Sequence, residues 1–431
     1  MLTLNDDSKT IEWMRLDNAA TIFALVYSKR ITTVFRLSAV IDHPVKVSIL
    51  QQALEHIIDR FPYYRVHLRR GLFWHYLEKN TALPKIEPEQ RDPCQKIEFT
   101  QGNNFPFRVM AYKNRVSVEF SHILTDGTGA LTFLKSLLAE YFTLLGVEIE
   151  DWGDIPRPDE QPDFEEYEDA FKHYYRKEIP FRPLVEKAFH LPERLDKKGS
   201  FHIITGITEV KEVLDKARSL KVSITEFLVS VYINVLQEIL HSYPPKKKRR
   251  LASPIRIMVP VNLRRIYKTK TMRNFSLYVI PGIDPRLGHY TFEEILNKVH
   301  HYMRSEVDDK FINQQIARNV RGELNPFVRF TPLVIKKLFG KAIYYNMGEK
   351  LYSGVLTNLG QVKLPKELEN HIESFYFLPA PSPFTKNACA IVSYKDKLVI
   401  SFGRVIKSQE VERKFFTSLV RMGIKVKVES N

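Results

Sequence analysis

The strongest constraint on the fold is a pattern of alternating strands and helices that occurs on both sides of an acidic, proline-containing segment. Three prolines between residues 156 and 162 break any helix there and favour extended backbone. A chain of 431 residues also exceeds the length at which one hydrophobic core usually stops growing. We therefore expect two α/β domains, residues 1–150 and 191–431, joined by a crossover linker and helix over 151–190.

Apolar periodicity locates the elements of each half. Alternating apolar residues predict strands, whereas apolar residues three or four positions apart predict helices. In the first half the expected strands are 33–41, 64–68, 72–77, 107–112 and 115–120, and the expected helices are 45–61 and 129–145. In the second half the expected strands are 201–209, 255–261, 276–280, 353–359, 374–378, 387–394 and 398–403. The helices expected after the prolines are 163–177, 210–220, 224–241, 292–304, 333–345 and 410–422.

The charge of the chain is unevenly distributed. Lysine and arginine number 65 against 50 aspartates and glutamates, a net charge of +15. Residues 140–169 hold twelve acidic residues and one arginine, so the rest of the chain carries +26. So basic a surface favours an anionic partner, such as nucleic acid, an anionic membrane, a phosphorylated cofactor or an acidic carrier protein.

Cysteine content and hydropathy indicate the cellular setting. Cys94 and Cys389 are too few for a disulfide framework or a cysteine-based metal site. With no other convergent set of histidines and carboxylates, we expect no metal. The apolar runs are shorter than the roughly 20 residues that span a bilayer, and the start of the chain lacks the pattern of a secretory signal. We expect a cytoplasmic protein without a transmembrane helix.

The chemistry is expected in the segment Ser121–Gly127, between the predicted strand 115–120 and the predicted helix that begins near residue 129. A turn from strand to helix displays side chains at the rim of a sheet, where functional groups are common. His122 is the one side chain there that exchanges protons near neutral pH. Asp126 is placed to fix the turn rather than to accept the proton, and Gly127 allows the positive φ that a tight turn often needs.

These residues resemble the chloramphenicol-acetyltransferase-like superfamily, which includes alcohol acetyltransferases and peptide-synthetase condensation domains. His122 with Asp126 and Gly127 is the most specific part of the resemblance, which spans roughly residues 10–405. Further segments resemble the family in its order along the chain: Arg60–Arg65, Gly71–Trp74, Val259–Arg265, Asn274–Ser276 and Leu356–Gly360. Condensation domains and wax-ester synthases commonly carry a second histidine where this chain has Ser121, and the Asp-Phe-Gly-Trp-Gly segment of the plant enzymes is absent. The sequence is therefore most similar to the single-histidine bacterial alcohol acetyltransferases.

The resemblance implies two α/β domains with mixed sheets flanked by helices and an active-site tunnel between them. It implies an acyltransferase that moves an acyl group from acyl-CoA, a co-substrate rather than a tightly bound cofactor, to a small alcohol or amine. His122 is then the general base, without an acyl-enzyme, and Asp126 pairs with Arg264 away from the substrate. Asn358, Ser276 and backbone N–H groups near Gly127 are the expected oxyanion donors. Because one chain already supplies both domains, a monomer is expected.

Several alternatives stay open at this point. The first is a carrier-protein-dependent condensation enzyme that makes an ester or amide. The second is a non-catalytic basic protein that binds nucleic acid or an anionic membrane, although no nucleic-acid-binding motif is recognisable. The run Lys246–Arg250 is a candidate patch for nucleic acid, coenzyme A phosphates or a carrier protein, or a solvated loop. Arg264 is alternatively a solvated strand-end charge, and Asn358 a turn former before Gly360.

Overall fold

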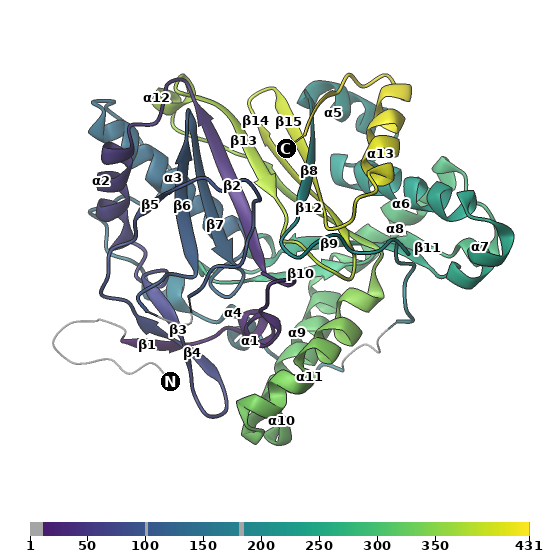
Figure 1. Cartoon of the computed structure of the whole chain (residues 1–431), viewed down its shortest axis with the longest axis horizontal. Helices are drawn as coiled ribbons and strands as arrows, with labels where there is room; N and C mark the ends of the chain where they lie inside the picture. The colour runs from purple at the N-terminus through teal and green to yellow at the C-terminus, as the bar shows by residue number, and fades with distance from the viewer. Residues whose placement is uncertain (1–11, 100–101, 181–184, 431) are drawn as a thin grey trace.

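The computed structural model describes residues 12–99, 102–180 and 185–430, and arranges them as three β-sheets flanked by helices (Figure 1). Two of the sheets are large, and they contain both parallel and antiparallel strand pairs. The predicted α/β class with mixed sheets is therefore confirmed.

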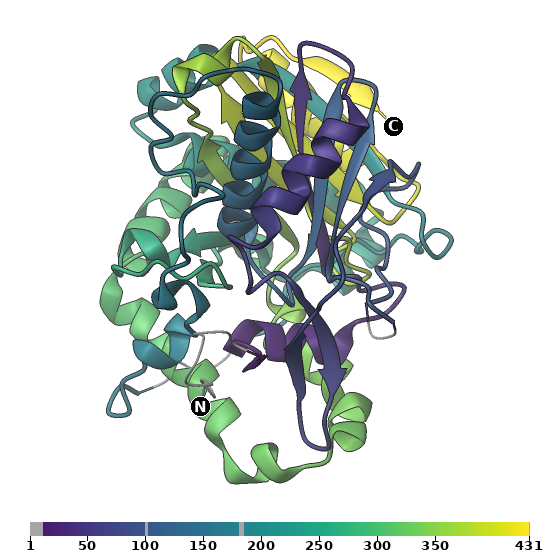
Figure 2. The same ribbon diagram turned by 90° about the vertical axis from the view of Figure 1, so that its left-hand side faces the viewer.

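The sheet of the first half has the strand order β13-β2-β7-β6-β5. Its strands are β2 (Val34–Ile41), β5 (Ile86–Pro88), β6 (Phe107–Tyr112), β7 (Arg115–Ser121) and β13 (Ile372–Leu378). Helices α2 (Val47–Ile58) and α3 (Gly127–Leu144) pack against each other in front of this sheet in Figure 2. Strand β13 comes from the second half of the chain and pairs antiparallel with β2, a crossover that periodicity did not predict.

The sheet of the second half has the order β10-β9-β12-β14-β15-β8-β16, with β11 paired to β9. The strands are β8 (His202–Glu209), β9 (Ile255–Asn262), β10 (Ser276–Val279), β11 (Gly282–Ile283), β12 (Gly354–Gln361), β14 (Asn387–Tyr394), β15 (Lys397–Arg404) and β16 (Lys427–Ser430). Its helices are α5 (Val210–Ser219), α6 (Ile224–Ser242), α8 (Phe292–Glu306) and α13 (Glu410–Arg421). Helix α6 contacts α5, α8 and α13, and most of its residues are buried.

A smaller group of elements forms the lower end of the molecule in Figure 1. It contains the sheet β1-β4-β3, made of β1 (Trp13–Arg15), β3 (Val66–Arg70) and β4 (His75–Lys79). Its helices are α1 (Asn18–Val26), α9 (Asp309–Leu324), α10 (Pro326–Phe330) and α11 (Leu333–Met347). Helix α1 packs on α11, so residues more than 300 positions apart meet beside the first sheet. The sequence predicted α11 but not α1, α9 or α10.

Two predictions about local structure were wrong. Residues 163–177 do not form one helix but two short turns, η1 (Phe164–Tyr167) and α4 (Ala170–His173). The reason is tertiary: Glu166 points inward, where its carboxylate accepts two hydrogen bonds from the Arg60 guanidinium at 2.7 and 2.8 Å. The basic run Lys246–Arg250, for which a solvated loop was one interpretation, lies instead in helix α7 (Pro245–Leu251), which begins with a proline at its first position, where the missing N–H costs nothing.

Short elements complete the described chain: η2 (Leu263–Arg265), η3 (Pro285–Leu287), η4 (Glu349–Leu351) and α12 (Lys366–Glu369). Within the described residues, no single helix has the length and hydropathy to cross a membrane; the bent pair α5 and α6, with 82° between them, meets those criteria only as a pair.

Close packing of α13 on the second sheet predicts a specific sensitivity to substitution. A Cβ at Gly206 in β8 would lie 2.2 Å from Cε1 of the buried Phe416 ring in α13. Gly206→Ala should therefore destabilise the fold by roughly 1–3 kcal/mol, as overpacking of a core does. Gly322→Ala is the matched control, because Gly322 lies in α9 with no atom near its absent Cβ. That variant should be as stable as the parent or more so by up to about 1 kcal/mol. Urea unfolding of both variants tests the contrast, and equal destabilisation would contradict it.

Candidate functional site

His122 lies immediately after strand β7, where the chain turns toward α3. Its backbone N–H donates to the Thr33 carbonyl at 2.8 Å, which fixes the position of the residue. Its Nδ1 lies 3.1 Å from the Thr125 carbonyl oxygen. A carbonyl can only accept, so Nδ1 carries the hydrogen in this contact and Nε2 keeps its lone pair. The ring is thus held in the tautomer that a general base requires.

Aromatic side chains enclose the His122 ring. Phe23 of α1 stacks on it with centroids 5.2 Å apart, and Phe35 of β2 lies at 4.5 Å. Loss of hydration lowers the pKa of His122 below its ordinary value, and the Asp126 carboxylate opposes this shift only in part. The imidazole is therefore neutral at pH 7. The residue as a whole is half-buried.

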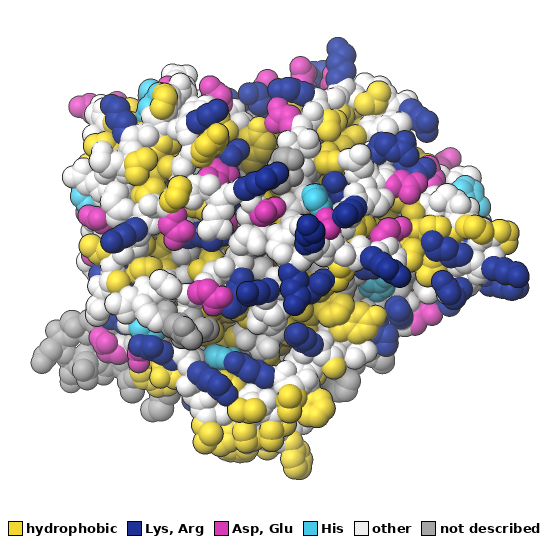
Figure 3. Space-filling view, in the orientation of Figure 1, with side chains coloured by type: hydrophobic (Ala, Val, Ile, Leu, Met, Phe, Trp, Pro, Cys, Tyr) yellow, Lys and Arg dark blue, Asp and Glu magenta, His cyan; other side chains and the backbone are white. Residues whose placement is uncertain are grey.

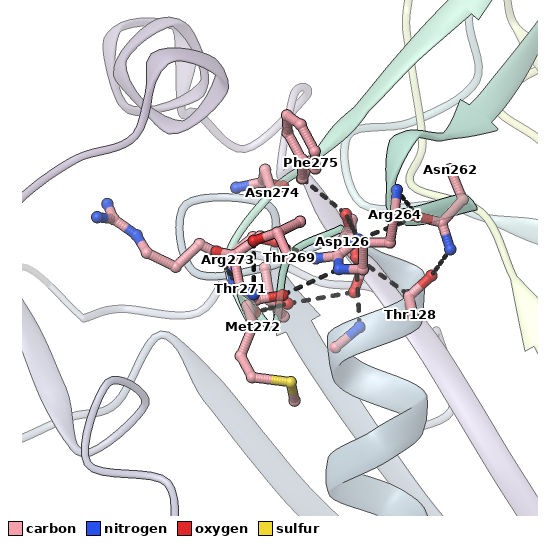
Figure 4. A network of polar contacts seen from close by, with 12 residues as sticks. Asp126, Thr128, Asn262, Arg264, Thr269, Thr271, Met272, Arg273, Asn274 and Phe275 are labelled. Atoms are coloured by element: carbon pink, nitrogen blue, oxygen red, sulfur yellow. Dashed lines mark hydrogen bonds and ion pairs between the residues drawn. The ribbon is translucent and has the colours of Figure 1, made fainter. Parts of the chain in front are cut away.

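Asp126 is the N-cap of α3 and is fully occupied by donors (Figure 4). Its Oδ1 accepts from the backbone N–H groups of Thr128 and Gly129 at 3.1 and 3.3 Å. Its Oδ2 accepts from Arg264 Nη1 at 2.8 Å and from the Phe275 N–H at 2.9 Å. The carboxylate therefore joins the start of α3 to the second half of the chain.

The Arg264 guanidinium binds a loop of the second half as well as Asp126. Its Nε donates to the Thr271 carbonyl at 2.9 Å, and Nη2 donates to the Arg273 carbonyl (Figure 4). Nη1 also reaches Asn262 Oδ1 at 3.3 Å. These contacts hold the end of β9 against residues 271–275, so Arg264 is not a solvated strand-end charge.

Three polar residues to which the sequence analysis gave no role, Asn274, Asp17 and Arg273, form a hydrogen-bonded and charged cluster that contacts the His122 backbone. Asn274 Nδ2 donates to the His122 carbonyl at 2.8 Å and to Asp17 Oδ2 at 3.0 Å. Asp17 caps α1 by accepting from the Ala20 N–H at 2.8 Å, and Arg273 Nε lies 3.7 Å from its Oδ2. Burial raises the pKa of Asp17 to about 6, against the lowering effect of Arg273. Asp17 and Asn274 lie 257 positions apart, so no local pattern could have joined them.

Gly127 and Gly129 lie where the two halves of the chain come close together. The prediction that Gly127 has a positive φ was wrong. Gly127 is the first residue of α3 and does not have a positive φ. A Cβ there would lie 2.8 Å from Cδ2 at the end of the Leu359 side chain of β12. Gly129 is tighter still, because its Cβ would lie 2.2 Å from Thr125 Oγ1 and 2.7 Å from the Met272 carbonyl oxygen.

The two side chains predicted as oxyanion donors lie on strands of the second sheet. Ser276 begins β10 and pairs with Asn262 of β9. Asn358 lies in β12, where Nδ2 donates to Thr225 Oγ1 at 3.0 Å and Oδ1 accepts from the Gly360 N–H at 2.8 Å. The Oδ1 atom of Asn358 therefore supports the turn at Gly360, which has φ +81°. No hydrogen bond joins either side chain to His122 within the described residues.

A buried carboxyl group, that of Glu349, is linked through Tyr344 to Phe23, the residue that stacks on His122. Phe23 packs edge-on against Tyr344 of α11 at 6.4 Å, and the Tyr344 hydroxyl donates to Glu349 Oε1 at 2.8 Å. Ser382 donates to Glu349 Oε2 at 3.0 Å. Burial raises the pKa of Glu349. Helix α11 is therefore anchored next to the aromatic cover of His122.

A cavity of about 450 Å³ opens between the two large sheets. Its lining includes Arg36 and Ser38 of β2 and Thr205 of β8, and His122 does not line it. No group of three or more His, Cys, Asp or Glu side chains in residues 12–99, 102–180 and 185–430 is arranged to hold a metal ion.

Comparison with known proteins identifies the fold. No family model matches the sequence, and no curated protein matches it. Among solved structures, the chain is similar to the nonribosomal peptide synthetase FmoA3 (TM-score 0.61, 12% identity), with 98% of this chain and 43% of that chain covered. It is similar to TRI3 trichothecene 15-O-acetyltransferase from Fusarium sporotrichioides (TM-score 0.61, 10% identity), with 97% and 96% covered. It is also similar to the starter condensation domain of rhizomide synthetase RzmA in complex with C8-CoA and Leu-SNAC (TM-score 0.57, 13% identity), with 94% and 93% covered.

The chain spans less than half of the FmoA3 chain but nearly the full length of TRI3 and of the RzmA domain. It therefore has the condensation-domain-like, chloramphenicol-acetyltransferase-like fold that the sequence predicted.

The ion pair between Asp126 and Arg264 predicts a large effect on stability. Asp126→Ala removes the cap of α3 and leaves a largely buried guanidinium without its carboxylate. We expect a loss of about 3–5 kcal/mol in the free energy of unfolding. Asp215→Ala, which breaks the exposed pair of Lys211 and Asp215, should cost less than about 1 kcal/mol. Urea unfolding compares the two, and a small loss for Asp126→Ala would show that the pair does not join the halves.

Proposed function

We propose that the chain is an acyltransferase that moves an acyl group from an acyl-CoA thioester to an alcohol or amine. The observation that carries the proposal is the His122 ring, whose Nδ1 is tied to a carbonyl while Nε2 keeps its lone pair. A neutral, half-buried imidazole in a fixed tautomer suits proton abstraction from a weakly acidic hydroxyl. The fold shared with an acetyltransferase and with condensation domains supports this reaction class.

In the proposed reaction, His122 Nε2 removes the proton from the acceptor hydroxyl as the acceptor oxygen attacks the thioester carbonyl carbon. The resulting tetrahedral intermediate carries a negative oxygen. Its collapse breaks the carbon–sulfur bond, and the leaving thiolate takes the proton from the His122 imidazolium. The products are an ester, or an amide from an amine, and free coenzyme A, so no acyl-enzyme and no further reactant is needed.

The negative oxygen requires a donor, and Asn358 is the side chain best prepared for this role. Thr225 and Gly360 fix the orientation of its amide group. Nδ2 carries two hydrogens, and no second acceptor for them lies in the described part of the chain. Ser276 and the backbone N–H near Gly127 are the other proposed donors. The N–H groups of Thr128 and Gly129 already serve Asp126.

A donor bound to a carrier protein is the second candidate, because FmoA3 is a nonribosomal peptide synthetase and RzmA contributes a condensation domain. Free acyl-CoA is preferred here because the similar RzmA domain is in complex with C8-CoA. The two donors present the same thioester to His122, so the mechanism at the base is common to both.

The first experiment measures thiol release from acetyl-CoA and longer acyl-CoAs against a panel of alcohols and amines. We expect acceptor-dependent release that falls by about 10²-fold or more in His122→Ala. His202→Ala is the control, because His202 lies on β8 of the other sheet in an ion pair with Asp196 and should retain activity. Release that is unchanged in His122→Ala would refute the general-base role. Release only from an acylated carrier protein would reassign the donor.

The pH dependence of kcat/KM follows from the direction of the His122 shift. Burial lowers the pKa of His122 below its ordinary value, so the neutral, basic form predominates at pH 7. kcat/KM should be constant above about pH 7 and fall about tenfold per pH unit once the pH drops below the folded pKa. Nitrogen-15 NMR of labelled histidine provides an independent check, with His122→Gln to assign the signal. Protonation of Nε2 rather than Nδ1 at neutral pH would contradict the assigned tautomer.

A further inference from the structure

Large apolar side chains gather on the surface of α10, α11 and the adjacent hairpin. Phe327 is 86% exposed, Leu338 is 75% exposed, and Leu72 between β3 and β4 is 71% exposed. Phe330 and Phe339 are also exposed by more than half. We call these five residues the apolar tip. It corresponds to the yellow surface at the lower end of Figure 3, where α10 and α11 lie in Figure 1.

Helix α11 differs from an ordinary surface helix because large apolar side chains lie on its outward face. Its inward positions are Leu333, Lys336, Gly340 and Tyr344, and a Cβ at Gly340 would lie 3.2 Å from Leu25 Cβ of α1. Its outward positions include Leu338 and Phe339. A helix of a water-soluble domain normally turns its apolar stripe to the core. Contiguous exposed apolar surface of this kind marks an interaction site.

Several contacts join the hairpin between β3 and β4 to α10 and α11 at the apolar tip. Lys336 Nζ lies 3.2 Å from the centroid of the Trp74 ring and donates to the Phe73 carbonyl at 2.8 Å. The Leu333 N–H donates to the Leu72 carbonyl at 2.8 Å. The Phe73 ring packs edge-on against Phe330 at 6.3 Å. The hairpin and the two helices therefore present their apolar side chains together.

The segment that contains α10 and α11 is basic and contains no acidic residue. Residues 325–347 contain Arg329, Lys336, Lys337 and Lys341 and no aspartate or glutamate. Arg70 of β3 lies near Lys337, since both charges help to lower the pKa of His75, after burial, to about 4. An apolar surface with a basic rim is the pattern of proteins that lie on anionic membranes.

This charge pattern disfavours a second copy of the chain as the occupant. A symmetric dimer would bring the same basic rim from both copies together, and like charges at close range repel. The apolar tip also projects from the lower extremity of the molecule (Figure 1). Projecting phenylalanines enter a deformable lipid layer without needing a matching concave surface.

We propose that the apolar tip docks the protein on the surface of an anionic phospholipid bilayer. Phe327, Phe330, Leu338 and Phe339 insert between the lipids, and Lys337 and Lys341 contact the headgroups. Docking in itself is independent of the proposed function. One consequence rests on that function: α11 packs on α1, whose Phe23 stacks on His122, so docking would hold the proposed base near the lipid surface, where apolar acyl donors and acceptors gather.

The experiment is co-sedimentation of the full chain with vesicles of phosphatidylcholine, with or without about one third phosphatidylglycerol. We expect strong binding to the anionic vesicles that weakens as salt rises, and weaker binding to phosphatidylcholine alone. The quadruple variant Phe327→Ser, Phe330→Ser, Leu338→Ser and Phe339→Ser should bind at least about 100-fold more weakly. Lys337→Gln and Lys341→Gln should weaken binding about fivefold each.

Two control variants match these changes elsewhere on the surface. Leu287→Ser with Val420→Ser removes exposed apolar side chains, and Lys246→Gln with Lys247→Gln removes charge from α7. Both controls should bind like the parent. Loss of binding in the α7 variant alone, or no binding by the parent, would overturn the proposal.

Light scattering after size-exclusion chromatography tests whether a second copy of the chain covers the apolar tip instead of a membrane. A concentration-dependent dimer that the quadruple variant abolishes would assign the apolar tip to a second copy and overturn membrane docking. Thiol release with water-soluble acceptors should be the same in the quadruple variant and the parent. That assay and the vesicle assay therefore fail independently, so the failure of the proposed function is distinguishable from the failure of docking.

Discussion

The rest of the site depends on the ion pair between Asp126 and Arg264. One carboxylate accepts two backbone N–H groups at the start of α3, one guanidinium nitrogen and one N–H of residue 275. The guanidinium in turn binds the carbonyls of the same loop. Because both ions are largely withdrawn from water, each would be costly without the other. This mutual need fixes α3 against a loop nearly 150 residues away.

The position of His122 follows from this junction. The loop that Arg264 holds also supplies Asn274, which binds the His122 carbonyl and Asp17 at the start of α1. Helix α1 then carries Phe23 onto the imidazole ring. Since Asp126 is saturated by other donors, the tautomer of His122 depends on the Thr125 carbonyl instead. Asp126 thus stabilises the fold, whereas the pKa and the tautomer of His122 depend on burial and on the Thr125 carbonyl.

Periodicity predicted most of the strands and long helices because each of them buries one face against a neighbour in the same half of the chain. It failed where distant partners override local preference. Glu166 turns toward Arg60 and interrupts the helix expected over 163–177. Strand β13 was predicted as a strand, but its pairing with β2 depends on an edge that the first half leaves open. Helix α10 has no inward apolar stripe, so it offered no periodic signal.

The sequence by itself determined the α/β class and the turn that carries His122, because periodicity and a short motif record local geometry. The pairing of Asp126 with Arg264 was expected only from the resemblance to a known family, since 138 residues separate the two. Only the tertiary structure decided what surrounds them. It brought Asp17, Phe23 and Asn274 to His122, and it showed that Gly127 does not have the positive φ expected of it. It also revealed that the outer face of α11 is apolar. Whether a residue faces a core, a partner or solvent depends on contacts between distant segments, which no local pattern encodes.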